Sequence, residues 1–294
     1  MHYELCIDKK IMEQWYREKY SDGVELNLQI KQVLVSQKTK VQQVDIFDSV
    51  EFGRVLCLDG QLMHTEKDEM IYHEMMVHPA MAANPSIRDV LVISVGNGGI
   101  VNELTKYKSI ESITVVEDDL DLIALLKKFM PNSANALNDS RVNMVIADNM
   151  RFTRTQKNKY DLIILDIPDP FGQGENHFTK EFYGACFTAL REDGILINQH
   201  ESCFYEDDIP ACQKAHINSK KVFDISKVFQ ANLPSYPSGY WLFGFSSKKH
   251  DPLEKLDKTA WDNLKIKTQY YNTDLHVGAF MLPTYVQRVL KNGK

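Results

Sequence analysis

Cysteine is scarce in this 294-residue sequence, and the few cysteines present form no motif. They stand at Cys6, Cys57, Cys186, Cys203 and Cys212, with no Cys-x-x-Cys pair among them. An odd number of scattered cysteines predicts neither a disulfide framework nor a zinc site. An excess of basic residues is also missing, because 34 Lys and Arg stand against 40 Asp and Glu, for a net charge of −6. A general nucleic-acid-binding protein needs a basic face, so we expect no nucleic-acid partner.

Long hydrophobic runs are absent as well. The N-terminal segment has no apolar core that would serve as a signal peptide, and no run approaches the roughly 18 residues of a membrane span. We therefore expect a cytoplasmic protein with no membrane partner. Glycine and proline are not enriched, at 14 and 10 residues, while 44% of the chain is apolar and 25% is charged. This is the composition of an ordinary globular protein.

Two hydrophobic patterns divide the chain. After a polar lead-in that is compatible with a helix, residues 24–37 and 40–49 alternate apolar and polar side chains, as half-buried antiparallel strands do. From about residue 85, short apolar runs alternate with segments of helical spacing. The runs are 91–94, 112–117, 142–147, 161–166 and 194–199, and 221–233 and 239–247 are suited to an antiparallel finish. We predict an α/β fold with a doubly wound sheet over residues 66–294 and a small antiparallel β domain over residues 1–65.

The first strand of the predicted sheet is followed by a glycine-rich turn, Ser94-Val95-Gly96-Asn97-Gly98-Gly99. Ligands of such sheets bind at the carboxyl ends of the strands. A dinucleotide fingerprint needs a third glycine where Val101 stands, so a pyrophosphate is not indicated. Glu117 ends the second strand and is placed to bind both hydroxyls of a ribose. Together these features favour a nucleoside without a pyrophosphate, such as S-adenosylmethionine; a plain tight turn and a solvated acid are the alternatives.

Two further strand ends carry polar residues. Asp148-Asn149 follows the third strand, where it would hydrogen-bond an adenine edge or cap the next helix. The fourth strand ends in Asp166-Ile167-Pro168-Asp169-Pro170. Two carboxylates three residues apart favour an acidic pocket for a cationic group, with one aspartate acting as a base. The alternative is a turn built on an Asx motif.

One segment resembles a zinc-binding motif but fails on spacing. His73-Glu74-Met75-Met76-Val77-His78 has one residue more than His-Glu-x-x-His. On a helix the two histidines would lie about 140° apart, so they could not share a metal ion. We expect no metal site.

Several longer motifs follow one another along the chain. They are Gly53-Arg54-Val55-Leu56, Leu58-Asp59-Gly60, Thr65-Glu66-Lys67-Asp68-Glu69, Tyr72-His73-Glu74-Met75, Phe178-Thr179-Lys180-Glu181-Phe182-Tyr183, Tyr236-Pro237-Ser238-Gly239, and Tyr270-Tyr271-Asn272 with His276. In this order, and with the strand-end residues above, the sequence resembles the polyamine aminopropyltransferases, the spermidine synthase family, over nearly its whole length. The resemblance implies a Rossmann-like fold of the class I methyltransferase type.

The resemblance also implies a reaction and its residues. An aminopropyl group would pass from decarboxylated S-adenosylmethionine, a co-substrate, to a diamine such as putrescine, giving spermidine and 5′-methylthioadenosine without a further cofactor. By matching motif, Asp166 is the base, and the diamine is bound by Asp169, Tyr72, His73, Tyr236, Gln199 and Glu201. The donor is bound by Gln42, Gly96, Asn97, Gly98, Glu117, Asp148, Asn149 and Gln173, beneath a lid at residues 171–177. Residues 1–65 would form part of the rim of the active site and assemble a homodimer or homotetramer.

The sequence departs from the family at this pocket. Where the family has Gly-Gly-Gly-Asp-Gly, this chain has Ser94-Val95-Gly96-Asn97-Gly98, so Asn97 replaces the aspartate that pairs with the donor's ammonium. Asn149 replaces a glycine, and Ile167-Pro168 replaces small hydroxyl residues. Three hypotheses follow: an ordinary aminopropyltransferase, a member with another substrate, or a non-catalytic homologue that binds nucleosides or polyamines. The other substrate would be intact S-adenosylmethionine, giving aminocarboxypropyl transfer, or an acceptor such as agmatine. Retention of both aspartates argues against the non-catalytic homologue.

Overall fold

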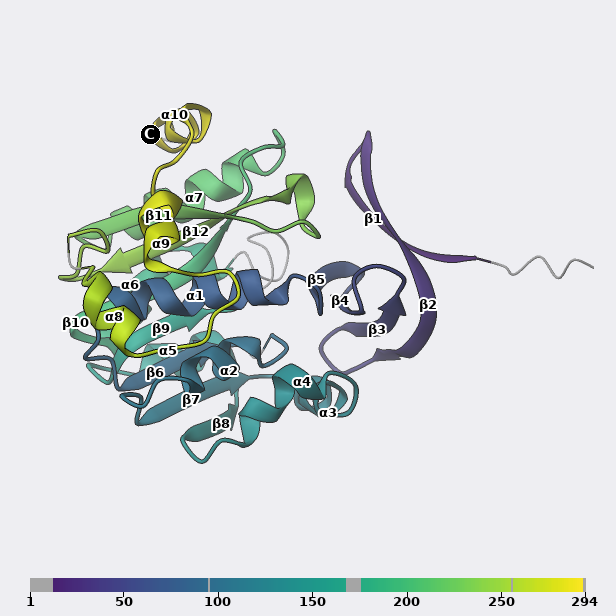
Figure 1. Cartoon of the computed structure of the whole chain (residues 1–294), viewed down its shortest axis with the longest axis horizontal. Helices are drawn as coiled ribbons and strands as arrows, with labels where there is room; N and C mark the ends of the chain where they lie inside the picture. Colours follow the sequence, from purple (N-terminus) through teal and green to yellow (C-terminus); the bar gives the residue numbers. More distant parts are fainter. Residues whose placement is uncertain (1–12, 95, 168–175, 255, 293–294) are drawn as a thin grey trace, which may run out of the picture.

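The computed structural model describes residues 13–94, 96–167, 176–254 and 256–292. Their strands form two sheets, one of five strands near the N-terminus and one of seven strands in the rest of the chain. The five-stranded sheet lies to one side of the larger body, at the end where helix α1 (Glu69–Ala83) begins (Figure 1). The chain therefore enters the larger body through α1, directly from the smaller sheet.

The five-stranded sheet is antiparallel and follows chain order. Its strands are β1 (Gln14–Ser21), β2 (Val24–Lys38), β3 (Gln43–Ser49), β4 (Arg54–Leu58) and β5 (Gln61–Thr65). The strands predicted over 24–37 and 40–49 are confirmed. Where the structure describes the polar lead-in, it is strand β1 and not a helix. Aromatic residues favour a pleated surface, and Tyr16 packs on Phe47 with ring centroids 5.4 Å apart.

The seven-stranded sheet has the order β11-β12-β10-β9-β6-β7-β8. Its strands are β6 (Asp89–Ile93), β7 (Ser112–Glu117), β8 (Val142–Ile146), β9 (Tyr160–Leu165), β10 (Leu190–Glu201), β11 (Ile225–Asn232) and β12 (Tyr240–Ser247). Neighbours from β10 to β8 run parallel, while β12 pairs antiparallel with both β10 and β11. The predicted parallel strands and the antiparallel finish are confirmed.

Helices cover both faces of this sheet. They are α1, α2 (Gly99–Thr105), α3 (Leu120–Phe129), α4 (Pro131–Ala134), α5 (Asn149–Thr155), α6 (Lys180–Ala189), α7 (Ile209–Lys220), α8 (Lys258–Asn263), α9 (Thr273–Ala279) and α10 (Thr284–Asn292), with 3-10 turns at Asn135–Asn138 and Pro237–Gly239. Successive side chains of a strand point to opposite faces. In β6, Val90 and Val92 accordingly join one core cluster while Leu91 and Ile93 join another. The doubly wound arrangement is confirmed.

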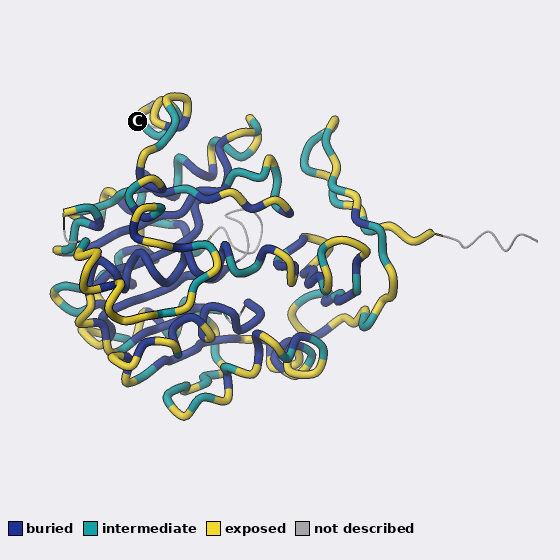
Figure 2. The backbone as a smooth tube through the Cα atoms, in the orientation of Figure 1, coloured by how far each residue is buried: buried dark blue, intermediate teal, exposed yellow. Residues whose placement is uncertain are grey.

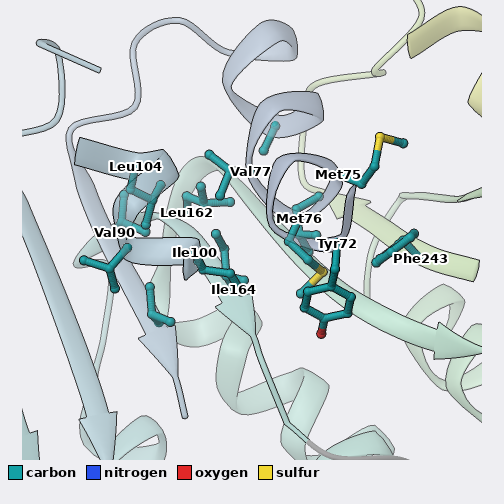
Figure 3. Close-up of a cluster of buried hydrophobic side chains, with 14 of the residues drawn as sticks. Tyr72, Met75, Met76, Val77, Val90, Ile100, Leu104, Leu162, Ile164 and Phe243 are labelled. Carbon is teal, nitrogen blue, oxygen red and sulfur yellow. The ribbon is translucent and has the colours of Figure 1, made fainter. Parts of the chain in front are cut away.

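Helix α1 is unusual because every residue from Ile71 to Ala83 is buried. Figure 2 shows the buried interior that surrounds it, and in Figure 3 Met76 and Val77 lie close to Leu162 and Ile164 of β9. Full burial of such a side chain contributes about 1.5–3 kcal/mol. The packing therefore fixes α1 across the sheet and presents its first turns to the carboxyl ends of β6 and β9. None of the helices in the described ranges is long and apolar enough to cross a membrane.

Candidate active site

Asp166 stands at the carboxyl end of β9, a strand buried along its whole length. Its N–H donates to the carbonyl of Ile93 at 2.9 Å, and only 4% of the residue is exposed. Tyr72 hydrogen-bonds the carboxylate, while Oδ2 has no partner among the described residues. Burial raises the pKa of Asp166 to about 7, the hydrogen bond from Tyr72 opposes the rise, and the charge of Glu117 adds to it. Such a carboxylate can take up a proton near neutral pH.

The glycine-rich turn passes directly beside Asp166. A Cβ on Gly96 would stand 2.1 Å from Asp166 Oδ2, and the backbone there has a φ of +49°. A Cβ on Gly99 would meet the ring of His73 at 2.0 Å. Both glycines are therefore required by the protein's own side chains, in addition to any ligand. The tight turn brings β6, Asp166 and α1 into contact at one point.

Two small cavities meet at Asp166, and both are lined by Met63, Asp166 and Ile167. We name them the Glu117 cavity, of about 120 Å³, and the Tyr72 cavity, of about 30 Å³. A larger hollow of about 1000 Å³ lies between α7, β11 and α10, but it contains none of the predicted site residues. The carboxylate between the two small cavities makes them the candidate site.

The Glu117 cavity brings together Gln42, Gly96, Glu117 and Asn149 from four separate segments. Glu117 is buried, and its Oε1 accepts the N–H groups of Asp118 and Asp119, each at 3.0 Å. Its Oε2 accepts a hydrogen bond from Ser94 Oγ at 3.1 Å. These bonds hold the carboxylate at the end of β7 in a fixed orientation, as a ligand for paired hydroxyls requires.

Other donor-side residues have distinct positions. Gln42 Nε2 donates to Asp119 Oδ2 at 3.2 Å, which ties the smaller sheet to the end of β7. Asn149 Oδ1 is buried without a hydrogen-bond partner in the described ranges. Asp148 is exposed and caps α5, accepting the Arg151 N–H at 2.6 Å. Of the two roles considered for Asp148, the structure shows the cap.

The Tyr72 cavity is lined by Tyr72, Gln199 and Tyr236, together with Trp241. Gln199 is fixed at both ends of its amide: Nε2 donates to the Ile167 carbonyl at 2.7 Å, and Oε1 accepts Trp241 Nε1 at 3.1 Å. Tyr236 Oη donates to the Met63 carbonyl at 2.5 Å. The walls are therefore aromatic surfaces with fixed polar groups, a suitable lining for a flexible amine.

Besides Asp148, four of the predicted residues within the described ranges lie outside both cavity linings. His73 lies against Gly99 and contributes to neither lining. Glu201 is buried at the end of β10, where Oε1 accepts the Ser202 N–H at 3.0 Å, outside both linings. The side chain of Asn97 turns away, donating from Nδ2 to Glu69 Oε2 and accepting the Gly99 N–H at 3.0 Å. Gly98, at a φ of +88°, precedes α2 beneath the turn.

Two predicted residues, Asp169 and Gln173, lie outside the described residues, as does most of the expected lid. His177, the last residue of that segment, lines the Glu117 cavity.

Sequence reasoning missed several residues that face the Tyr72 cavity. Glu18 and Tyr20 come from β1, His64 comes from β5, and Trp241 comes from β12. His64 had a readable signal, since it is a polar residue two positions from Leu62 on the buried side of a strand, just before a quoted motif. Glu18 and Tyr20 had none, because their position depends on how the sheets pack.

The polar side chains that line the two cavities are carboxylates, amides, phenols and hydroxyls, together with the imidazoles of His64 and His177. No group of three or more His, Cys, Asp or Glu residues that could hold a metal ion occurs within the described part of the chain. His73 and His78, which begin and end the zinc-like segment, have different neighbours: His73 packs on Gly99, and His78 Nδ1 lies 2.7 Å from Tyr107 Oη.

Comparison with known proteins agrees with this geometry. A model described as "Spermine/spermidine synthase domain" matches residues 69–258, and one described as "Spermidine synthase tetramerisation domain" matches residues 14–66. This chain belongs to the spermine/spermidine synthase family. It is therefore an enzyme of the class that transfers an aminopropyl group.

Individual relatives resemble the chain over nearly its full length. A polyamine aminopropyltransferase of Clostridium botulinum (strain Eklund 17B / Type B) is 52% identical over 283 residues, covering 96% of this chain and all of that protein. One of Alkaliphilus oremlandii is 51% identical over 280 residues, 95% of this chain and 99% of that protein.

Solved structures show the same fold. A spermidine synthase in complex with the transition-state analogue AdoDATO superimposes with a TM-score of 0.92 at 38% identity, covering 95% of both chains. Spermidine synthase from Thermotoga maritima gives 0.91 at 36% identity, with the same coverage. The resemblance, fold class and enzyme class predicted from the sequence are confirmed.

Proposed function

We propose that this protein transfers the aminopropyl group of decarboxylated S-adenosylmethionine to a primary amine of a diamine such as putrescine, forming spermidine and 5′-methylthioadenosine. The observation that carries the proposal is Asp166, a buried carboxylate with a free oxygen at the junction of two cavities. The Glu117 cavity would hold the nucleoside and the Tyr72 cavity the diamine.

The elevated pKa of Asp166 answers the main chemical difficulty. The acceptor enters as an ammonium with a pKa near 10, and proton transfer to an ordinary aspartate would cost roughly 8 kcal/mol. With the pKa of Asp166 at about 7, the cost falls to roughly 4 kcal/mol, and burial of the amine lowers it further. The released lone pair then attacks the donor's methylene carbon. The C–S bond breaks with its electron pair going to sulfur, so no acid is needed for the leaving group.

The remaining residues are assigned to binding. Glu117 would accept the two ribose hydroxyls, while Gln42, Gly96 and Asn149 contact the nucleoside. Tyr72 orients Asp166, and the diamine lies against Tyr236 and Gln199. From the sequence alone we retain Asp169 for the cationic end of the acceptor and Gln173 for the donor. No further cofactor enters the proposal.

Intact S-adenosylmethionine is a weaker candidate donor. The hypothesis of an intact donor required the Asn97 amide to face the donor's carboxylate. Instead, Asn97 Nδ2 donates to Glu69, and the side chain lies outside both cavity linings. The decarboxylated donor therefore remains the proposal. For the same reason, the side-chain roles of Asn97, His73 and Glu201 in ligand binding receive no support from their positions.

We further propose a domain boundary near residue 65, with residues 1–65 assembling a homodimer or homotetramer and forming part of the rim of the site. In support, the tetramerisation model matches residues 14–66, and Trp15 and Val33 expose 47% of their surfaces. Light scattering would measure the assembly, and a monomer at micromolar concentration would contradict it.

The activity is tested by mass spectrometry with putrescine and either donor, following release of methylthioadenosine. Spermidine formed only with the decarboxylated donor supports the proposal. Absence of product and of methylthioadenosine with both donors contradicts it. Asp166→Asn should lower turnover at least 1000-fold while the nucleoside still binds. Because the base must be ionised, kcat/KM of the wild type should rise with pH up to about 7 and then level.

Asp161→Asn is the matched control. Asp161 is a buried carboxylate at the other end of β9, where Oδ2 accepts the N–H groups of Arg88 and Asp89 at 2.8 and 2.9 Å. It should retain turnover at temperatures where it remains folded. Equal losses in both variants would mean that Asp166 matters only for folding.

A further inference from the structure

His64 is a histidine of β5 that lines the Tyr72 cavity together with Asp166. It is 1% exposed, and its ring centroid lies 5.4 Å from that of Tyr72 and 5.0 Å from that of His73. The aromatic neighbours hold the ring in place without using its nitrogens. His64 therefore presents polar atoms to the cavity wall beside the proposed base.

Neither ring nitrogen of His64 has a hydrogen-bond partner within the described part of the chain. Leaving a buried polar atom unpaired costs about 1–3 kcal/mol, and such atoms call for an explanation. Here the unpaired nitrogens occur beside Asp166 Oδ2, which is unpaired as well. Two unpaired acceptor groups lining one cavity indicate a ligand that carries several N–H donors.

The geometry around Gly96 places the two groups together. The point where a Cβ of Gly96 would stand is 2.1 Å from Asp166 Oδ2 and 3.4 Å from His64 Nε2. Gly96 itself lines the Glu117 cavity, so the carboxylate and the imidazole, which both line the Tyr72 cavity, approach each other where the two cavities adjoin. One small polar group entering from the cavity can reach both.

We infer that His64 binds the attacking amine of the acceptor, accepting a second N–H hydrogen bond beside the one made to Asp166. The inference rests on the function proposed above and assigns a specific subsite to it. Asp166 takes the proton that the ammonium loses. The imidazole keeps its own proton throughout and holds the resulting amine so that its lone pair points at the donor carbon.

The state of the imidazole suits this role. Burial lowers the pKa of His64 to about 4, so the ring is neutral and one nitrogen retains a lone pair. A group with that pKa is a weaker base than Asp166, so it orients the amine and does not deprotonate it. The entropic cost of orienting the nucleophile is a large part of the free-energy barrier to a displacement between two bound molecules.

Two variants distinguish the hydrogen bond accepted by a His64 nitrogen from the packing of the His64 ring. His64→Phe keeps the packing on Tyr72 and His73 but removes both nitrogens, and we expect kcat/KM for the diamine to fall roughly 10- to 100-fold. His64→Gln supplies a carbonyl acceptor at similar reach and should recover most of the loss. The KM for the donor should stay within about twofold in both variants.

His216→Phe is the control. His216 is also buried with an unpaired Nδ1 within the described ranges, but it belongs to α7 and lines the separate large hollow. It should leave the kinetics of the diamine unchanged. Full activity of His64→Phe, or an equal loss in His64→Gln at unchanged thermal stability, would overturn the inference. Wild-type turnover is the separate measure of the proposed function.

A measurement on the wild type covers the case in which His64→Phe does not fold. In protein labelled with 15N-histidine, the His64 nitrogen resonances, assigned by their loss in His64→Gln, should shift on addition of putrescine and not of methylthioadenosine. Unshifted resonances at saturating diamine would overturn the inference.

Discussion

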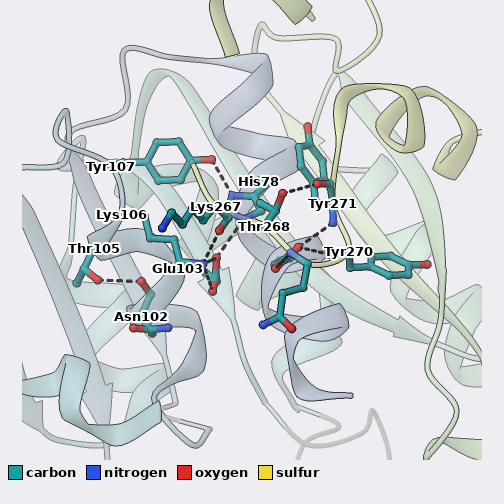
Figure 4. Close-up of polar contacts among 12 residues, drawn as sticks. His78, Asn102, Glu103, Thr105, Lys106, Tyr107, Lys267, Thr268, Tyr270 and Tyr271 are labelled. Carbon is teal, nitrogen blue, oxygen red and sulfur yellow. Dashed lines mark hydrogen bonds and ion pairs between the residues drawn. The ribbon is translucent and has the colours of Figure 1, made fainter. Parts of the chain in front are cut away.

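The two ends of helix α1 bury polar groups in opposite ways. Near its start, His64 and Asp166 Oδ2 have no hydrogen-bond partners in the described ranges. Near its other end, His78 Nδ1 is hydrogen-bonded to Tyr107 Oη at 2.7 Å, and Nε2 lies 3.1 Å from Glu103 Oε2, close enough for a charge contact but outside hydrogen-bond geometry (Figure 4). Helix α1 thus connects a region with unpaired buried polar atoms to a region where His78 and Glu103 contact other side chains.

The paired region is consistent with a structural role. Burial disfavours the charge of Glu103, but the contact with His78 and the hydrogen bonds from Lys106 outweigh it and hold the pKa of Glu103 below its ordinary value. Lys106 Nζ also donates to the carbonyl of Lys267 at 3.0 Å, which attaches the C-terminal segment. At the Asp166 end, burial raises the pKa of a carboxyl group instead. Unpaired groups are costly, so a fold retains them where function requires them.

The largest effect should follow from removing the carboxylate of Glu74, a fully paired group in the first half of α1. Its buried carboxylate accepts three backbone N–H groups, from Gln269 at 2.7 Å, Tyr270 at 2.9 Å and Tyr271 at 2.7 Å. Glu74→Ala leaves all three without an acceptor, and we expect the free energy of unfolding to fall by roughly 5 kcal/mol. Urea denaturation followed by circular dichroism would measure it.

Glu74→Gln is the matched variant, since its one remaining oxygen keeps part of the bonding and should lose less. A change below about 1 kcal/mol in Glu74→Ala would show that solvent replaces these bonds, and that the pairing of Glu74 does not stabilise the fold.

The opposite effect is expected at the unpaired end. Because the pKa of Asp166 is higher in the folded protein, at about 7, than its ordinary 3.8, folding favours the protonated acid. The wild type should therefore lose stability as pH rises from about 4 through about 7, by roughly 4 kcal/mol in total. Asp166→Asn has no such charge, so it should unfold less readily than the wild type at pH 8 while losing turnover.

The pH series provides its own control. At pH 4 Asp166 is already protonated in the folded wild type. The greater stability of Asp166→Asn that we expect at pH 8 should therefore disappear. A constant difference between the two proteins from pH 4 to pH 8 would contradict the raised pKa. The variant would then act through packing alone.

The fold and the strand-end residues could be predicted from the sequence, whereas the pairing of buried polar groups could not. The strand 161–166 and its terminal aspartate were predictable because a short apolar run that alternates with helical segments favours a buried parallel strand, and ligands bind at the ends of such strands. Gly96 and Glu117 followed from the same rule. The architecture was therefore accessible from local patterns.

The partners of these residues were not accessible. His73 was predicted at the cavity from its motif, but the close approach of Gly99 places its ring away from both linings, and His64 takes the cavity wall. Whether a polar side chain is paired depends on residues distant in sequence: the acceptor for Gln269 is Glu74, and Glu18 reaches the cavity from β1. Such contacts depend on tertiary packing, which sequence spacing does not report.

The smallest effect sharpens the comparison at a residue that lies by the site yet is paired. Asn97 Nδ2 donates to Glu69, whose other oxygen accepts Ser133 Oγ at 2.9 Å. Burial raises the pKa of Glu69, while the bonds from Ser133 and Asn97 counter the rise. Asn97→Asp would replace that donor with a second carboxyl group, and we expect a loss of about 2 kcal/mol in unfolding free energy at pH 8.

The double variant Asn97→Asp/Glu69→Gln decides the cause, because a glutamine amide can donate to the new aspartate and reverse the polarity of the pair. It should regain most of the stability, giving a strongly non-additive cycle in urea denaturation. Additive losses would mean that the two side chains do not depend on each other. Recovery of the unfolding free energy would show that Asn97 stabilises the fold as the partner of Glu69. The neutral amide in this turn then has a structural explanation, and no change of the aminopropyl donor is needed to account for it.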